Sequence, residues 1–268
     1  MRTLYFIAFS IFSLACNSAN NSTDSSNTNA IESPKQLQYE IVKIYPHDTS
    51  SYTQGLEWNG SQLIEGTGNY GKSILHILDS NMQSLGKKVK LSAEDFGEGT
   101  TLFNDKIYQL TWKEHKVYVY NASTLEKIKE LYWPYEGWGL THNDSSLIVS
   151  TGGSNIYFVN PDNFAIQRTV GVYNKFGYVS DINELEFFNG KIAANIYLTN
   201  DIIFIDPNSG LVKETLNFDQ LLAQAKVQID PSTIDPGYVL NGIAYHPARK
   251  TLFITGKCWP IMAEIIVK

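Results

Sequence analysis

The sequence predicts an all-β protein, a five-bladed β-propeller closed by its N-terminal strand. Two observations lead to this fold. A short pattern occurs five times between residues 54 and 257, and strand-like segments follow each copy. The fifth copy lacks its last strand, and a strand-like segment lies at the start of the domain instead. Repeats of this length indicate stacked or radial architecture, and a strand supplied from the other terminus would close a ring of blades.

Each copy of the repeat starts with a polar or aromatic residue. A small or acidic residue comes next, and a short apolar stretch follows. The copies occupy residues 54–58, 98–102, 138–142, 183–187 and 241–245. A second strand begins eight residues after the small or acidic residue in four copies, and ten residues after it in the fifth. We expect these strands at 63–68, 107–112, 147–152, 192–197 and 252–257, where β-branched and aromatic residues are frequent.

Further strands complete each repeat. The predicted third strands are 73–78, 116–120, 155–159, 201–205 and 263–267, and the predicted fourth strands are 87–91, 127–132, 166–170 and 212–216. Asx, Ser, Pro and Gly residues close the first four third strands, as expected for turns. The fifth repeat has no fourth strand, because the chain ends at Lys268. We expect segment 39–45, which has high β-propensity, to pair as the outer strand of that repeat.

An antiparallel sandwich or barrel of similar strand content is the alternative fold. It explains neither the recurring period of about 40 to 58 residues nor the missing last strand. One segment, 217–239, is longer than its counterparts. We expect a short helix at 218–226 and a loop around Asp230-Pro231 and Asp235-Pro236-Gly237.

The N-terminal region predicts export. Residues 1–15 combine a basic start with an apolar run too short to span a bilayer, which is the layout of a secretory signal peptide. Cys16 and the polar, flexible tether of residues 16–35 resemble a bacterial lipoprotein processing site, although Ser13 stands where that motif prefers Leu. We therefore expect a protein of the periplasm or cell envelope, lipid-anchored through Cys16. The alternative is an ordinary secretory signal with an incidental cysteine.

The remaining chain, 36–268, is long enough for one sizeable core and forms the predicted propeller domain. Cys258 is its one cysteine, so an internal disulfide framework is excluded. The formal charge is −6 and no basic stripe occurs, which argues against nucleic acid as a partner. We expect a monomer whose contact with a membrane is through the lipid anchor alone.

Two rings of residues are expected at one mouth of the propeller channel. The first residues of the repeats form one ring: Gln54, Glu98, Trp138, Asn183 and Asn241. The last residues of the second strands form the other: Gly68, Trp112, Gly152, Tyr197 and Lys257. Antiparallel neighbours place the start of one strand beside the end of the next, so both rings share a face. Such a pocket suits a small polar ligand with an apolar stem.

Glu98 is the one acidic residue in the first ring. Walls of Trp112, Trp138 and Phe96 would remove water from its carboxyl group and raise its pKa towards neutrality, as a general acid/base requires. Less specific interpretations stay open. Glu98 could form a structural ion pair with Lys257, the tryptophans could be core residues, and Lys257 could extend to solvent.

Other candidates are weaker. Asn183 and Asn241 could cap turns, and strand alternation places Glu184 and Glu186 on the face opposite Asn183. The five histidines and Cys258 show no metal-ligand spacing, and the chain has neither a glycine-rich phosphate loop nor a serine nucleophile elbow. We expect no metal and no cofactor, and we interpret Cys258 as a small buried residue.

Several motifs resemble a known family along the chain from about Tyr39 to Lys268. They are Tyr52-Thr53-Gln54-Gly55-Leu56, Phe96-Gly97-Glu98-Gly99, Gln109-Leu110-Thr111-Trp112, Gly137-Trp138-Gly139, Asn183-Glu184-Leu185-Glu186, Asn195-Ile196-Tyr197, Leu240-Asn241-Gly242-Ile243-Ala244 and Thr255-Gly256-Lys257-Cys258-Trp259-Pro260. This set is similar to the plant- and bacterial-type glutaminyl-peptide cyclotransferases.

The resemblance implies a five-bladed β-propeller that converts the N-terminal glutamine of peptides or proteins to pyroglutamate, releasing ammonia without a catalytic metal. It implies Glu98 as the catalytic acid/base. It also implies a substrate pocket lined by Gln54, Trp112, Trp138, Asn183 and Lys257. Tyr197 falls where members of the family often have Trp, which alters that wall of the pocket.

Two other classes of function are considered. A non-catalytic cell-surface propeller would bind peptide or glycan at the same mouth without turnover. A metal-dependent hydrolase or lactonase would need several carboxylates and amides around one ion, and Glu98 alone in the first ring argues against it.

Overall fold

The structure is a computed structural model that describes residues 31–227 and 237–268. The predicted signal peptide, Cys16 and the tether as far as residue 30 lie outside the described residues, as do Asp230-Pro231 and Asp235-Pro236. Across the described ranges, no helix has both the length and the apolar character needed to cross a membrane.

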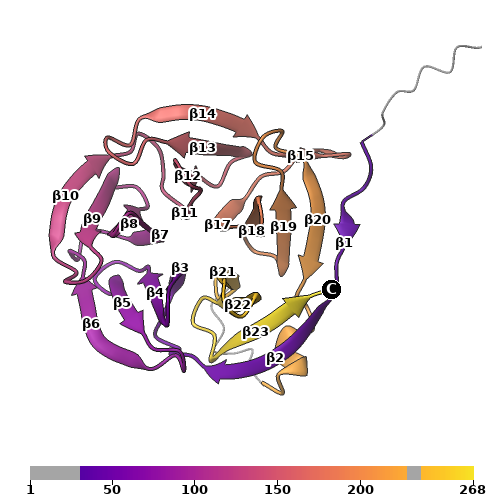
Figure 1. Ribbon diagram of the computed structural model, residues 1–268, viewed down its shortest axis with the longest axis horizontal. Helices are drawn as coiled ribbons and strands as arrows, with labels where there is room; N and C mark the ends of the chain where they lie inside the picture. Colours follow the sequence, from indigo (N-terminus) through magenta and orange to yellow (C-terminus); the bar gives the residue numbers. More distant parts are fainter. Residues whose placement is uncertain (1–30, 228–236) are drawn as a thin grey trace, which may run out of the picture. The chain divides into compact units, whose positions relative to one another are not determined.

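Five sheets stand around a central axis as the blades of a propeller, which confirms the predicted fold (Figure 1). Blade 1 contains β3 (Thr53–Asn59), β4 (Gln62–Thr67), β5 (Ile74–Leu78) and β6 (Ser84–Lys90). Blade 2 contains β7 (Gly97–Phe103), β8 (Lys106–Thr111), β9 (Lys116–Asn121) and β10 (Lys127–Tyr132). Blade 3 contains β11 (Leu140–His142), β12 (Leu147–Ser150), β13 (Asn155–Val159) and β14 (Ile166–Gly171).

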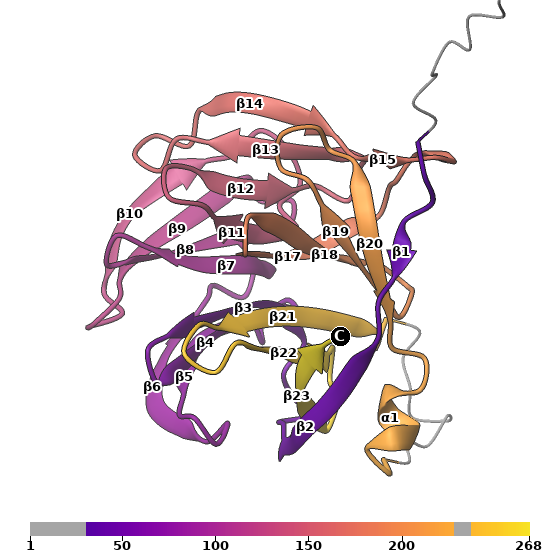
Figure 2. The same ribbon diagram turned by 45° about the vertical axis from the view of Figure 1, so that its right-hand side comes forward.

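The last two blades share the N-terminal part of the described chain. Blade 4 contains β17 (Ile182–Phe188), β18 (Lys191–Ile196), β19 (Asp201–Ile205) and β20 (Val212–Asn217), with β1 (Lys35–Gln36) along its edge. Blade 5 contains β21 (Leu240–His246), β22 (Thr251–Gly256) and β23 (Ile261–Val267), and β2 (Tyr39–Pro46) is its outer strand. In each blade the first strand of the repeat lies innermost and faces the axis (Figures 1 and 2).

Two-residue turns join the two inner strands of blades 1, 2 and 4. In blade 2, Asn104 and Asp105 have φ angles of 50° and 58°, and in blade 4 Asn189 and Gly190 have φ angles of 50° and 74°. Two successive left-handed residues match the twist of a two-residue hairpin, and Asn, Asp and Gly are the residues that adopt them most readily. In these blades the turn fixes the register between the innermost strand and its neighbour.

The ring closes where the sequence predicts. β2 runs antiparallel to β23, with Tyr39 opposite Val267 and Pro46 opposite Ile261. Figure 2 shows β2 lying along β23 and β1 lying beside β20. Adding the N-terminal strand to the C-terminal blade leaves no open seam between first and last blades.

Three local differences from the prediction have physical causes. β1 pairs in parallel with β20, so the end of the predicted tether is a strand; its side chains are exposed and give no apolar pattern. The helix α1 (Leu221–Gln224) is shorter than the predicted 218–226, because Phe218 is buried and stacks on Tyr39 before the helix begins, and Lys226, with a φ of 57°, cannot continue it. A hairpin of β15 (Tyr173–Asn174) and β16 (Gly177–Tyr178) follows blade 3, where the sequence shows no alternation.

The cores lie between neighbouring blades rather than inside any one of them. Between blades 2 and 3, Leu110 and Val117 pack with Trp133, Leu140 and Val149, all at most 1% exposed. Because both faces of the inner strands are covered, a polar side chain buried at the axis without a partner costs free energy. The functional groups occur at one end of these strands.

Candidate active site

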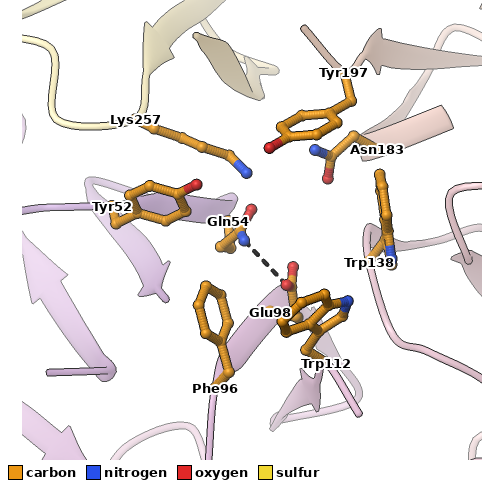
Figure 3. Close-up of a pocket in the computed structure, with 9 residues that line it drawn as sticks. All are labelled: Tyr52, Gln54, Phe96, Glu98, Trp112, Trp138, Asn183, Tyr197 and Lys257. Carbon is orange, nitrogen blue, oxygen red and sulfur yellow. Dashed lines mark hydrogen bonds between the residues drawn. The ribbon is translucent and has the colours of Figure 1, made fainter. Parts of the chain in front are cut away.

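A pocket of about 240 Å³ opens at the end face where the innermost strands begin and the second strands end (Figure 3). Nine residues line it: Tyr52, Gln54, Phe96, Glu98, Trp112, Trp138, Asn183, Tyr197 and Lys257. Pockets for drug-sized ligands are usually about 300–1,000 Å³. This pocket is smaller, and its volume suits a single amino-acid side chain.

The repeat brings these residues together from all five blades. Gln54, Glu98 and Asn183 belong to the innermost strands β3, β7 and β17. Trp138 precedes β11, while Trp112, Tyr197 and Lys257 directly follow β8, β18 and β22. All seven site residues predicted from the sequence thus line one pocket, and the two predicted rings share a face.

The remaining members of the two rings support the walls from behind. Gly68 leaves room for Phe96, because a Cβ atom there would overlap the Phe96 ring. Gly152 lies against the indole of Trp138, where a Cβ atom would come within 2.6 Å of Cζ2. Gly68 and Gly152 therefore leave the space that the Phe96 and Trp138 rings occupy, and a larger residue at either position would push the ring into the pocket.

Asn241 does not line the pocket, contrary to the ring prediction, and it does not cap a turn. Its Nδ2 donates to the Thr53 carbonyl oxygen at 2.9 Å and to Gln54 Oε1 at 3.1 Å. The side chain is fully buried between the inner strands of blades 5 and 1. Asn241 therefore acts on the pocket through Gln54, whose amide orientation it fixes.

Glu98 is the buried acid of the pocket. Its residue is 5% exposed, and Oε1 accepts a hydrogen bond of 3.0 Å from Gln54 Nε2. Burial raises the pKa of Glu98 well above its ordinary value; Lys257 opposes the shift, and the charges of Glu114 and Glu136 add to it. Glu98 can therefore keep a proton at a pH at which an ordinary carboxyl group has lost it.

Lys257 is buried beside this acid and lies between two tyrosine rings. Its residue is 3% exposed, and Nζ is 4.7 Å from the ring centre of Tyr52 and 4.9 Å from that of Tyr197. Burial lowers the pKa of Lys257 to about 8, against the attraction of Glu98. Within the described part of the chain, no Glu98–Lys257 contact is close enough for an ion pair, so the structural ion pair considered above is not formed.

Aromatic rings form the apolar walls. Phe96 meets Trp112 with ring centres 5.6 Å apart, and Trp138 meets Tyr197 edge-on at 5.5 Å. Unlike Trp133, which is buried in the core, Trp112 and Trp138 stay partly exposed towards the pocket. The core interpretation of these two tryptophans is therefore wrong, and their faces are available to an apolar stem.

Asn183 contributes an unused acceptor. The residue is 2% exposed, and no group among the described residues donates to its Oδ1. Its main chain is held by Ser150, whose Oγ donates to the Asn183 carbonyl oxygen at 2.6 Å. A buried acceptor without a partner costs about 1–3 kcal/mol, which a ligand N–H could recover.

Sequence reasoning missed two residues that share one position in the repeat. Tyr52 lines the pocket two residues before Gln54, just as Phe96 does two residues before Glu98. Glu136 stands two residues before Trp138 and accepts hydrogen bonds from both pocket tryptophans. Comparing the repeats at this earlier position would have pointed to Tyr52, which matches Phe96, but it gives no sign that Glu136 bonds both indoles.

The other acids near the axis bind main-chain groups. Glu184 accepts from the Leu56 and Ile243 N–H groups at 3.3 and 2.9 Å, and Glu186 accepts from Tyr245 N–H at 2.7 Å. Both lie away from the pocket, as strand alternation predicts. In residues 31–227 and 237–268, no group of three or more His, Cys, Asp or Glu side chains is arranged to hold a metal ion.

The fold and pocket define a class of protein: a five-bladed propeller with a buried acid and a buried lysine in an aromatic pocket of side-chain size. Residues 9–267 match a family described as Glutamine cyclotransferase. The chain is 31% identical over 233 residues to the glutaminyl-peptide cyclotransferase of Arabidopsis thaliana, covering 86% of this chain and 72% of that one.

A solved structure agrees with the sequence match. The crystal structure of Myxococcus xanthus glutaminyl cyclase superposes with a TM-score of 0.80 at 32% identity, covering 88% of this chain and 98% of that chain. The protein therefore belongs to the glutamine cyclotransferase family.

Proposed function

We propose that the protein is a glutaminyl-peptide cyclotransferase, which converts the N-terminal glutamine of peptides or proteins to pyroglutamate and releases ammonia. The observation that carries the proposal is the buried Glu98, with its raised pKa, in a pocket of side-chain size. Membership of the family supports the choice of reaction.

The reaction needs folding of the substrate and movement of protons. The α-amine nitrogen of the glutamine attacks its own γ-carboxamide carbon, a new N–C bond closes a five-membered lactam, and the bond to the amide nitrogen breaks. No water is consumed and no electrons leave the substrate. The attack is intramolecular, so a pocket that holds the side chain folded back removes much of the barrier.

Glu98 is the proposed general acid/base. Its carboxylate takes a proton from the attacking amine and delivers it to the departing nitrogen, which leaves as ammonia. A positioned acid/base of this kind typically contributes about 10²–10⁴-fold to the rate. Gln54 holds the carboxylate through the bond to Oε1, which leaves Oε2 for the substrate.

Polar groups opposite the walls would bind the substrate amide. Lys257 and the amides of Gln54 and Asn183, which line the pocket, would hold the amide oxygen as negative charge develops on it, as the donors of an oxyanion hole do. The faces of Trp112 and Trp138 cover the methylene groups. These interactions need no metal, so we propose metal-independent turnover, which treatment with EDTA should leave unchanged.

The test is direct. Purified protein is incubated with a peptide that begins with Gln, and ammonia and the cyclised peptide are measured. We expect turnover in the wild type and in Glu130→Gln, a control in the outer strand β10 that carries the same chemical change. Glu98→Gln should lose at least about 10²-fold in kcat.

Two outcomes contradict the proposal. Turnover that survives in Glu98→Gln rejects the assigned acid/base. Binding of the peptide without ammonia release in the wild type rejects the enzyme and supports a non-catalytic peptide-binding propeller.

A cell-envelope location with a lipid on Cys16 is a separate proposal, which mass spectrometry of the mature N-terminus tests.

A further inference from the structure

The carboxylate of Glu136 joins the two tryptophans that wall the pocket. Its Oε2 accepts a hydrogen bond of 2.9 Å from Trp112 Nε1 and one of 3.1 Å from Trp138 Nε1. Trp112 follows the second strand of blade 2, and Trp138 precedes the first strand of blade 3. A single oxygen therefore connects two walls that come from different blades.

The acceptor itself is anchored in the core. Trp133 is 1% exposed, and its Nε1 donates to the main-chain oxygen of Glu136 at 3.2 Å. Gly137 N–H also donates to the Trp112 carbonyl oxygen at 2.9 Å. The peptide group between Glu136 and Gly137 is thus bonded through both its carbonyl oxygen and its N–H, which fixes the main chain that carries the Glu136 carboxylate beside the pocket.

The rings depend on this acceptor for their orientation. An indole has one polar hydrogen, and each of these two directs it to Glu136 Oε2. Lys113 covers the outer face of Trp112, with Nζ 3.7 Å from the ring centre and 3.7 Å from Glu136 Oε1. Without the carboxylate both N–H groups would donate to water instead, and no shared acceptor would fix the orientation of the two rings relative to each other.

We propose that Glu136 is a positioning residue that sets the distance and tilt of the Trp112 and Trp138 walls around the substrate side chain. The inference rests on the proposed cyclotransferase activity for its kinetic test. It adds a residue that does not line the pocket and touches the substrate only through the two indoles.

A second nearby acid separates positioning from plain charge. Glu114 also lies close enough to act on Glu98, but its carboxylate accepts from Tyr70 OH at 2.9 Å and from Phe96 N–H at 3.3 Å, not from an indole. Glu114→Gln and Glu136→Gln remove one charge each. Glu136→Ala additionally removes the acceptor, whereas Gln keeps an oxygen that can accept both N–H groups.

The experiment compares Glu136→Ala, Glu136→Gln and Glu114→Gln with the exposed control Glu130→Ala. Kinetics with the Gln-initiated peptide should show kcat/KM about 10- to 100-fold lower in Glu136→Ala, because a misplaced wall costs that much. Glu136→Gln should recover most of this loss. The melting temperature should change little, because the Glu136 side chain is 41% exposed.

Tryptophan fluorescence gives a readout that does not need turnover. Of the five tryptophans, Trp112 and Trp138 are the ones left partly exposed, so acrylamide quenching reports mainly on them. We expect greater quenching in Glu136→Ala than in the wild type, and near wild-type quenching in Glu136→Gln.

Two results would overturn the inference. One is wild-type quenching in a folded Glu136→Ala protein. The other is equal kinetic losses in Glu136→Gln, Glu136→Ala and Glu114→Gln, which would reduce Glu136 to a charge acting on Glu98. If the wild type does not release ammonia, the proposed function fails, while the quenching comparison still decides the positioning role.

Discussion

Gln54 donates from Nε2 to Glu98 Oε1 at 3.0 Å while its own Oε1 accepts from Asn241 Nδ2 at 3.1 Å. The three side chains come from the innermost strands of blades 1, 2 and 5. Because Asn241 presents a donor to Gln54, the amide of Gln54 can present only its own donor to Glu98. The direction of this chain of hydrogen bonds keeps an acceptor, the carboxylate, at its pocket end.

The first prediction concerns this chain. Asn241→Ala should lower kcat/KM about tenfold, because Gln54 becomes free to rotate, and should destabilise the protein by about 1–3 kcal/mol by leaving a buried acceptor unpaired. Gln54→Ala and the double variant complete a double-mutant cycle. The measured losses in activity should be strongly non-additive; additive losses would show that Asn241 does not act through Gln54.

The pH dependence of activity is the second prediction. Glu98 accepts a proton only when ionised, so kcat/KM should rise with pH through its raised pKa, well above the ordinary 4.5. Lys257, whose pKa is lowered to about 8, should lose its charge above that pH, and kcat/KM should fall again. A rate profile with the wild type and Lys257→Arg checks this, since arginine keeps its charge. An alkaline limb at the same pH in both proteins would remove Lys257 from the explanation.

The repeat allowed the site to be predicted in part. Residues at the first position of the repeat, such as Glu98 and Asn183, could be predicted because the innermost strand of each blade brings that position to the same mouth of the channel. Asn241 occupies the same position, yet it turns towards blade 1 beside Gly242, whose φ is 123°. Strand alternation cannot show such a local change of direction. The role of Glu136 also escaped prediction, because it depends on two indoles that are brought together only by the packing of blades 2 and 3.

The third prediction concerns a buried cluster at the junction of blades 5 and 1. Glu65 accepts from His47 Nε2 at 3.0 Å and from His76 Nε2 at 2.8 Å. His47 Nδ1 lies 2.9 Å from the Trp259 carbonyl oxygen, to which it donates. Both ring nitrogens donate, so His47 is an imidazolium that faces the Glu65 carboxylate. His47 directly follows β2, and its two bonds join this end of the strand to Glu65 of blade 1 and to Trp259 of blade 5.

Stability should therefore fall on both sides of a mildly acidic range. Burial alone would lower the pKa of His47, but attraction to Glu65 raises it above 6.5. Its contribution is complete below that pH and is lost as the pH rises through the folded-state pKa. Burial alone would raise the pKa of Glu65, but His47 and His76 hold it well below 4.5, so its contribution is complete above 4.5 and is lost as the pH falls.

Thermal unfolding across this pH range measures the effect. The contribution of this cluster to the free energy of unfolding of the wild type should be largest between about pH 4.5 and 6.5. Glu65→Gln should lose about 3 kcal/mol or more, because it leaves His47 without its partner in the interior. It should also lose the alkaline decline attributed to His47. An unchanged pH profile in Glu65→Gln would place the titrating groups elsewhere.

The last prediction concerns the closing strand β2. Its main chain pairs with β23 along its whole length, and Tyr45 OH donates to Glu264 Oε2 at 2.8 Å. Removing residues 37–46 from the full chain should expose the edge of β23 and the core beneath Tyr45, and cooperative thermal unfolding should be lost. Removing residues 31–36 is the matched control: it deletes β1, which pairs with β20 through two residues only, and should leave the unfolding transition in place. A synthetic peptide of residues 37–46 should restore cooperative unfolding to the first variant by adding the missing strand, and a variant that melts like the wild type without this peptide would show that β2 does not close the ring.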